Sequence, residues 1–156
     1  MKKLAFVSFQ PFGSSYGSLV AVPDLSLLEN PEVTLRQASE QYCNSVTKMK
    51  SLAVHIDDQR RSYRPISARS IWRLGNEIIE MVEHFRQLSV QIDSLYDHLD
   101  RDIGMKRKRL EKVVILRRYL PTEALIPDSL NWGALEKGTR KKALLLLEGI
   151  SVDSDS

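Results

Sequence analysis

The fold is decided by residues 71–99, which read IWRLGNEIIEMVEHFRQLSVQIDSLYDHL. Apolar side chains recur in this stretch at alternating steps of three and four residues. We call them the apolar seam: Ile71, Leu74, Ile78, Met81, Phe85, Leu88, Ile92, Leu95 and Leu99. This spacing puts every member on one face of an α-helix. It predicts one long helix that begins near Ser67 and carries the whole seam.

Helical spacing continues on both sides of the seam. Apolar residues recur from Leu35 to Tyr63 after a helix start at Pro31, and Pro65 interrupts that helix. Further helices are predicted over residues 105–120 and, after a connector, from Thr139 to Gly149. The predicted fold class is therefore all-α, a helical bundle with one long heptad-patterned helix.

The first thirty residues have a different character. Two short β-favouring runs, residues 4–9 and 18–22, are separated by Pro11, Gly13 and Gly17. They predict a small hairpin or an extended, β-like arm. We therefore divide the chain into an N-terminal arm or hairpin (1–30), a helical bundle (31–150) and a polar tail (151–156).

Gly104 leaves the end of the long helix open. A glycine just past an apolar run is typical of a helix C-terminus. However, a break there would leave Asp97, Asp100 and Asp102 at the negative end of one helix, and residues 106–109 would bring four cations to the positive end of the next. An unbroken helix would turn the same charges into favourable pairs four residues apart. Both interpretations stand at this point.

The apolar seam also has two candidate partners. The side chains of Ile79, Val82, Val90 and Tyr96 widen it beyond a narrow coiled-coil stripe, which favours packing against other helices of the same chain. The alternative is a coiled coil with a second polypeptide through residues 67–100. That alternative leaves a homo-oligomer open.

Composition restricts the class of protein. The chain has 156 residues, a formal net charge of +3 and one cysteine, Cys43, which cannot form an intrachain disulfide. There is no run of about 18 apolar residues, and the apolar run near the N-terminus is too short for a secretory signal. We expect a single-domain cytoplasmic protein that does not interact with membranes.

No stretch carries the signature of a catalytic, cofactor or metal site. His84 and His98 are too far apart on a helix to share a metal, and His55 beside Asp57 and Asp58 has no further ligand at a matching offset. The glycine-rich segment 13–18 has no phosphate-binding lysine after it. We therefore predict no catalytic residue, no metal, no cofactor and no enzymatic activity.

Clustered basic residues are the remaining functional signal. Lysine and arginine along helices bind nucleic-acid phosphates without reading base sequence. The candidate nucleic-acid-binding residues are Lys106, Arg107, Lys108, Arg109, Lys112, Arg117 and Arg118, then Arg60, Arg61, Arg64, Arg69 and Arg73, and lastly Arg140, Lys141 and Lys142. Tyr63 and Trp72 lie near the second cluster and could stack on bases, although aromatic residues at helix junctions more often fill the core.

With its seam over residues 71–99 and its basic stretch over residues 106–118, the chain resembles in architecture the small helical subunit of CRISPR effector complexes. That resemblance implies an RNA-binding and DNA-binding subunit in an antiviral defence complex, together with other protein subunits. The competing hypothesis is a coiled-coil adaptor, scaffold or regulatory protein that binds a partner through residues 67–100.

Overall fold

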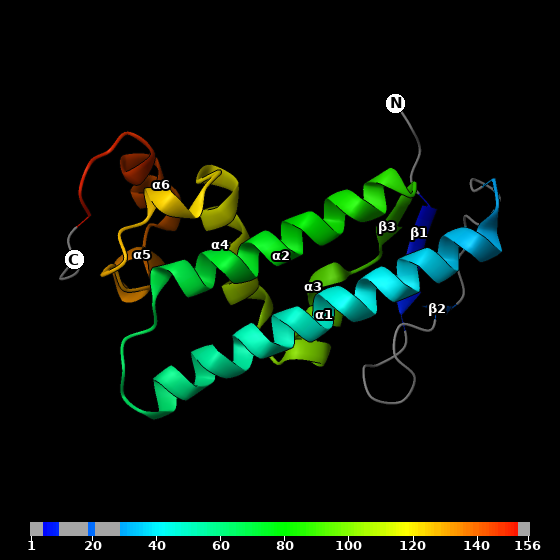
Figure 1. Ribbon diagram of the computed structural model, residues 1–156, viewed down its shortest axis with the longest axis horizontal. Coiled ribbons are helices and arrows are strands. Elements are labelled where there is room, and N and C mark those ends of the chain that lie inside the picture. The colour runs from blue at the N-terminus through cyan, green and yellow to red at the C-terminus, as the bar shows by residue number, and fades with distance from the viewer. Residues whose placement is uncertain (1–4, 10–18, 21–28, 153–156) are drawn as a thin grey trace.

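The computed structural model describes residues 5–9, 19–20 and 29–152, which are mostly helical (Figure 1). The predicted mostly helical fold is confirmed. The helices are α1 (Pro31–Arg61), α2 (Ala68–Gln87), α3 (Leu95–Ile103), α4 (Arg107–Tyr119), the 3-10 turn η2 (Glu123–Leu125), α5 (Gly133–Glu136) and α6 (Thr139–Leu147). The strands are β1 (Ala5–Phe9), β2 (Leu19–Val20) and β3 (Val90–Ile92). The rest of the predicted arm and residues 153–156 of the predicted tail lie outside the described residues.

The core forms around α2, which packs against α1 on one side and α4 on the other. Helices α1 and α2 run side by side in opposite directions, and α4, α5 and α6 gather near the start of α2 (Figure 1). The side chains of Ile71, Leu74, Ile78 and Met81 are at most 1% exposed. This part of the seam is therefore covered by helices of its own chain. Among the described helices, none is both long and apolar enough to cross a membrane.

The prediction of a single long helix over residues 67–99 is wrong. Helix α2 ends at Gln87, β3 follows, and α3 begins only at Leu95. Ser89 and Ser94 adopt left-handed φ values of 63° and 52°, which no continuous right-handed helix contains. Val90 and Ile92 are buried while Gln91 between them is exposed, so this short stretch satisfies strand alternation as well as helical spacing.

The structure also shows whether the helix continues through Gly104: the helix breaks there. Helix α3 ends at Ile103, Gly104 follows it with a left-handed φ of 73°, and α4 starts after Lys106. The wrong-sign charges that argued against a break are consequently present. Asp102 is buried at the end of α3, and Lys106, Arg107 and Lys108 are exposed at the start of α4.

Buried polar contacts compensate Asp102. The hydroxyl of Tyr42 on α1 donates a hydrogen bond to one carboxylate oxygen of Asp102, and Nε of Arg101 lies 3.2 Å from the other. Burial raises the pKa of Tyr42 far above its ordinary value, and the hydrogen bond to Asp102 raises it further. The contact fixes α3 against the middle of α1, because a buried carboxylate without partners would be costly.

A small sheet closes the end of the α1–α2 pair opposite α5 and α6 (Figure 1). Strand β1 pairs in parallel with β3 (Ala5 with Val90 and Val7 with Ile92) and antiparallel with β2. A β1–β3 pair joins two segments far apart in the sequence. It attaches the N-terminal segment to the helical bundle, so the two predicted regions share one sheet.

Helices α2 and α4 approach each other closely at Gly75. A Cβ atom at this position would lie 2.6 Å from the carbonyl oxygen of Val113 and 2.9 Å from the Cβ of Arg117. Only a glycine leaves room for that carbonyl. Gly75 therefore sets the distance between α2 and the helix that carries most of the predicted basic stretch.

Candidate nucleic-acid interface

The N-terminal part of α4 presents the densest group of exposed cations. Lys106, Arg107 and Lys108 are exposed, and the first turn of α4 has no acidic residue. Arg107 forms an exposed ion pair with Glu111 one turn later, with Nε 3.1 Å from Oε1. Positive side chains at a helix N-terminus add to the positive end of the helix dipole. The exposed charge at this end of α4 is therefore net positive.

Farther along α4 the basic residues take different roles. Nε of Arg109 is buried and has no hydrogen-bond partner among the described residues, and Lys112 is half-buried. The guanidinium of Arg117 stacks on the ring of Trp72, 5.3 Å from its centroid, and donates to the side-chain oxygen of Asn76. Arg118 remains exposed. The predicted basic stretch is thus exposed at Lys106–Lys108 and Arg118, whereas basic side chains between these positions are partly buried.

Arg118 borders a hollow between α2, α3 and α4. Its volume is about 400 Å³, and Ile79, Val82, Leu95 and Tyr96 contribute apolar surface to its lining. Burial raises the pKa of the Tyr96 hydroxyl, while nearby Arg118 works in the opposite direction. The hollow combines an apolar lining with a cationic edge.

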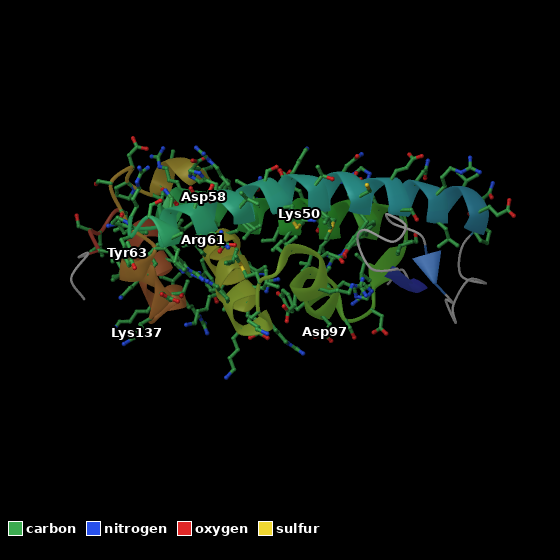
Figure 2. The ribbon with its side chains drawn as sticks, turned by 90° about the horizontal axis from the view of Figure 1, so that it is seen from below. Lys50, Asp58, Arg61, Tyr63, Asp97 and Lys137 are labelled. Carbon is green, nitrogen blue, oxygen red and sulfur yellow. The ribbon has the colours of Figure 1, made fainter. Side chains whose placement is uncertain are left out.

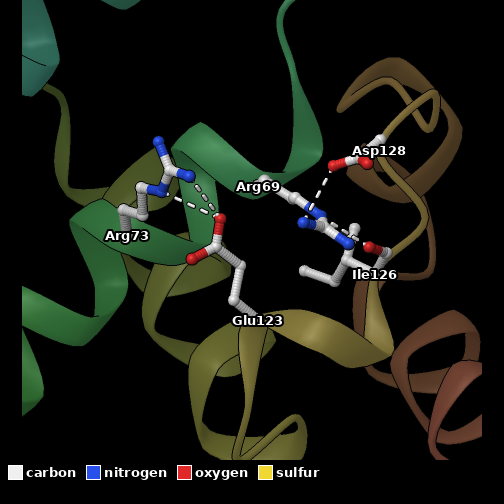
Figure 3. Close-up of polar contacts among 5 residues, drawn as sticks. All are labelled: Arg69, Arg73, Glu123, Ile126 and Asp128. Carbon is white, nitrogen blue, oxygen red and sulfur yellow. Dashed lines mark hydrogen bonds and ion pairs between the residues drawn. The ribbon is translucent and has the colours of Figure 1, made fainter.

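Two residues of the second predicted cluster bind groups of their own chain (Figure 3). Arg69 donates to the carbonyl of Ile126 at 2.7 Å and forms an ion pair with Asp128. Arg73 pairs with Glu123 at 2.6 Å. Both contacts attach the start of α2 to the connector between α4 and α5. These two arginines stabilise the fold at the corner between α1 and α2.

The other three arginines of that cluster surround the end of α1. Arg60, Arg61 and Arg64 are exposed, and within residues 29–152 none of them forms an ion pair. Two of them also complement the negative end of the α1 dipole. The loop that follows α1 carries Tyr63, whose side chain is 98% exposed. Trp72, by contrast, is buried and donates from Nε1 to the carbonyl of Leu120 at 2.8 Å.

The third cluster lies on α6. Arg140 and Lys141 are exposed, and Arg140 also stacks over the ring of Tyr119 at 5.5 Å. Lys142 instead donates to the carbonyl of Ala134 at 2.6 Å. Lys137 is exposed at the same end of the molecule as Arg61 and Tyr63 (Figure 2). It was missed because a single lysine in a connector gives no clustering signal.

The structure thus separates most of the predicted residues into two exposed groups and a set that is held by other parts of the chain, which we call the held set. One group is at the start of α4, and the other is at the end of the molecule that holds the α1–α2 corner, α5 and α6 (Figures 1 and 2). The held set contains Arg69, Arg73, Arg117 and Lys142, whose side chains contact other helices or connectors of the same chain, although Arg73 itself is exposed.

The histidine candidates occupy separate places. His55 and His84 are exposed on α1 and α2, and buried His98 has its Nδ1 3.0 Å from the carbonyl oxygen of Ser94. Within the part of the chain that the structure describes, no three histidine, cysteine or acidic side chains lie close enough together to hold a metal ion.

Fold and site together define a mostly helical protein with two separate exposed basic regions. Comparison of this chain with models of protein families, with curated proteins and with solved structures gives no match.

Proposed function

We propose that this chain binds the phosphate backbone of nucleic acids without sequence specificity, as a non-enzymatic subunit of a larger nucleoprotein assembly. The start of α4 carries the proposal, because Lys106, Arg107 and Lys108 are exposed at the positive end of a helix. Each such cation opposes the helix dipole at a cost of about 0.3–1 kcal/mol. A bound phosphate offsets this cost, since it attracts both the cations and the free N–H groups of the first turn.

The competing coiled-coil adaptor has less support. It needs the seam residues of α2 to face a partner, but Leu74, Ile78 and Met81 are covered by α1 and α4. Exposing them would unpack the core of the bundle. The basic surface does not have this difficulty, because its side chains already face solvent.

Contact with other subunits is supported by α6 and the turn after it. Leu144, Leu147 and Ile150 are between 39% and 46% exposed, which is unusual for large apolar side chains grouped within a short segment. They offer a small apolar surface beside the basic residues of α6. An RNA-guided defence complex in the cytoplasm is the setting that the architectural resemblance implies, and we include it in the proposal.

Charge reversal at α4 tests backbone binding. We expect Lys106→Glu with Lys108→Glu to weaken binding to random single-stranded and double-stranded oligonucleotides about tenfold or more, and to lower the slope of log K against log salt by about 2. Fluorescence anisotropy across a salt series measures both quantities. Because the new carboxylates complement the dipole of α4, the thermal stability of this variant should hold or rise.

The matched control is Arg36→Glu with Lys48→Glu, which changes the net charge equally at exposed positions of α1 outside the predicted surface. We expect it to leave the salt slope close to that of the native chain. If both variants lose affinity equally, only net charge matters and no interface exists at α4. Absence of any salt-dependent binding by the native chain overturns the proposal.

A further inference from the structure

The loop after α1 contains an aromatic residue that the fold does not explain. The side chain of Tyr63 is 98% exposed, so its ring contributes nothing to the core. Its backbone adopts a left-handed φ of 55°. Bulky residues rarely adopt this conformation, because the Cβ atom crowds the backbone there.

The backbone around Tyr63 forms a helix-ending motif that normally contains glycine. The N–H of Tyr63 donates to the carbonyl of Arg60 at 3.1 Å, and the N–H of Arg64 donates to the carbonyl of Gln59 at 2.8 Å. These two bonds make a Schellman motif with Tyr63 at the left-handed position, where glycine is strongly preferred. A tyrosine at this position keeps an aromatic ring in solvent at the expense of backbone strain.

Three arginines flank Tyr63 in the sequence. Arg60 and Arg61 precede it on the last turn of α1, and Arg64 follows it directly. All three are exposed, and the nearest carboxylates in sequence, Asp57 and Asp58, form no ion pair with them within residues 29–152. Figure 2 shows Tyr63 and Arg61 at one end of the molecule, and the 98% exposure of the Tyr63 side chain leaves its ring open to a ligand.

We infer that Tyr63 is a stacking platform for an unpaired base, with Arg60, Arg61 and Arg64 binding the adjoining phosphates. An exposed aromatic ring among arginines suits single strands, because their bases have free faces that stack on it. Bases inside a duplex are stacked on one another and cannot reach the ring. This inference rests on the proposed nucleic-acid binding and adds to it a preference for single-stranded over double-stranded ligands.

Two substitutions of Tyr63 separate stacking from charge and folding. Tyr63→Gly removes the ring and relieves the strained backbone, so the chain stays folded and its melting temperature should not fall. Tyr63→Phe keeps the ring without the hydroxyl. The ligands are a fluorescein-labelled oligothymidylate and a duplex of the same length and mixed sequence, titrated by anisotropy over a salt series.

We expect Tyr63→Gly to weaken binding of the oligothymidylate roughly 5- to 150-fold, which corresponds to the loss of one base–aromatic stack. Its affinity for the duplex should change by less than about twofold, and the salt slope should stay constant because no phosphate contact is removed. Tyr63→Phe should bind both ligands as the native chain does.

The outcomes distinguish this inference from the proposed function. If the native chain binds both ligands with a steep salt dependence and Tyr63→Gly binds the single strand equally well, the platform is refuted and backbone binding stands. An equal loss on single strand and duplex, or a loss in Tyr63→Phe as large as in Tyr63→Gly, also refutes stacking. If the native chain binds neither ligand, both proposals fail.

Discussion

Replacing Gly75 by alanine tests how closely α2 and α4 are packed. In an exposed helix this change stabilises by about 1 kcal/mol, because glycine is the poorer helix former. At Gly75 the added Cβ would meet the carbonyl oxygen of Val113 at 2.6 Å, and the helices would have to separate by roughly 0.8 Å to restore a 3.4 Å contact. Overpacking of this kind costs about 1–3 kcal/mol, and the upper part of the range applies because the clashing atom is backbone. The expected net result is a loss of about 2 kcal/mol.

Urea unfolding followed by tryptophan fluorescence measures this loss, since Trp72 and Trp132 are both buried and change environment on unfolding. The melting temperature should fall by about 4–8 °C. Gly133 supplies the matched control: a Cβ there would have no atom within 4 Å, so Gly133→Ala should be neutral or stabilising by up to about 1 kcal/mol. If Gly75→Ala is as stable as the native chain, the close approach of α2 and α4 is refuted.

Two further predictions concern the helix break and the buried tyrosine. Ser89→Gly should raise the free energy of unfolding in urea by about 0.5–1 kcal/mol, because Ser89 has a φ of 63°; a loss of about 1 kcal/mol would instead indicate a continuous helix. Tyr42→Phe should cost about 1–3 kcal/mol at neutral pH by removing the hydrogen bond that the Tyr42 hydroxyl donates to buried Asp102. The pKa of Tyr42 is raised in the folded state, so its hydroxyl contributes fully to the free energy of unfolding below pH 10. Above pH 10 this contribution is lost by up to about 1.4 kcal/mol per pH unit. The difference between Tyr42→Phe and the native chain should therefore narrow from pH 10 upward, and a constant difference would contradict that shift.

Sequence patterns identify the helices well where one periodicity applies. Pro31 and Pro65 gave clear boundaries, and α1, α4 and α6 begin and end within a few residues of the predicted limits. The break after Gln87 was missed because Leu88 and Ile92 fit both the heptad spacing and the alternation of a strand. Only the pairing of β3 with distant β1 decides between them, and local spacing contains no information on that partner.

The candidate interface was predictable to a similar degree. Lys106 and Lys108 could be identified as exposed cations from their density alone. The ion pairs of Arg69 and Arg73 could not be predicted, because their partners Asp128 and Glu123 are more than forty residues away in the sequence. The electrostatic argument against a break at Gly104 was wrong, because it could not foresee that Tyr42 compensates Asp102.

The parallel pairing of β1 with β3 has a consequence for the order of folding on the ribosome. Strand β1 is synthesised first, but its partner emerges on the order of 85 residues later, which takes roughly 4–17 s at ordinary rates of translation. Throughout that interval its backbone donors and acceptors lack the neighbour on one side. Helices α1 and α2 can meanwhile assemble from local contacts, so the β1–β3 pair is expected to form after the α1–α2 pair during biosynthesis.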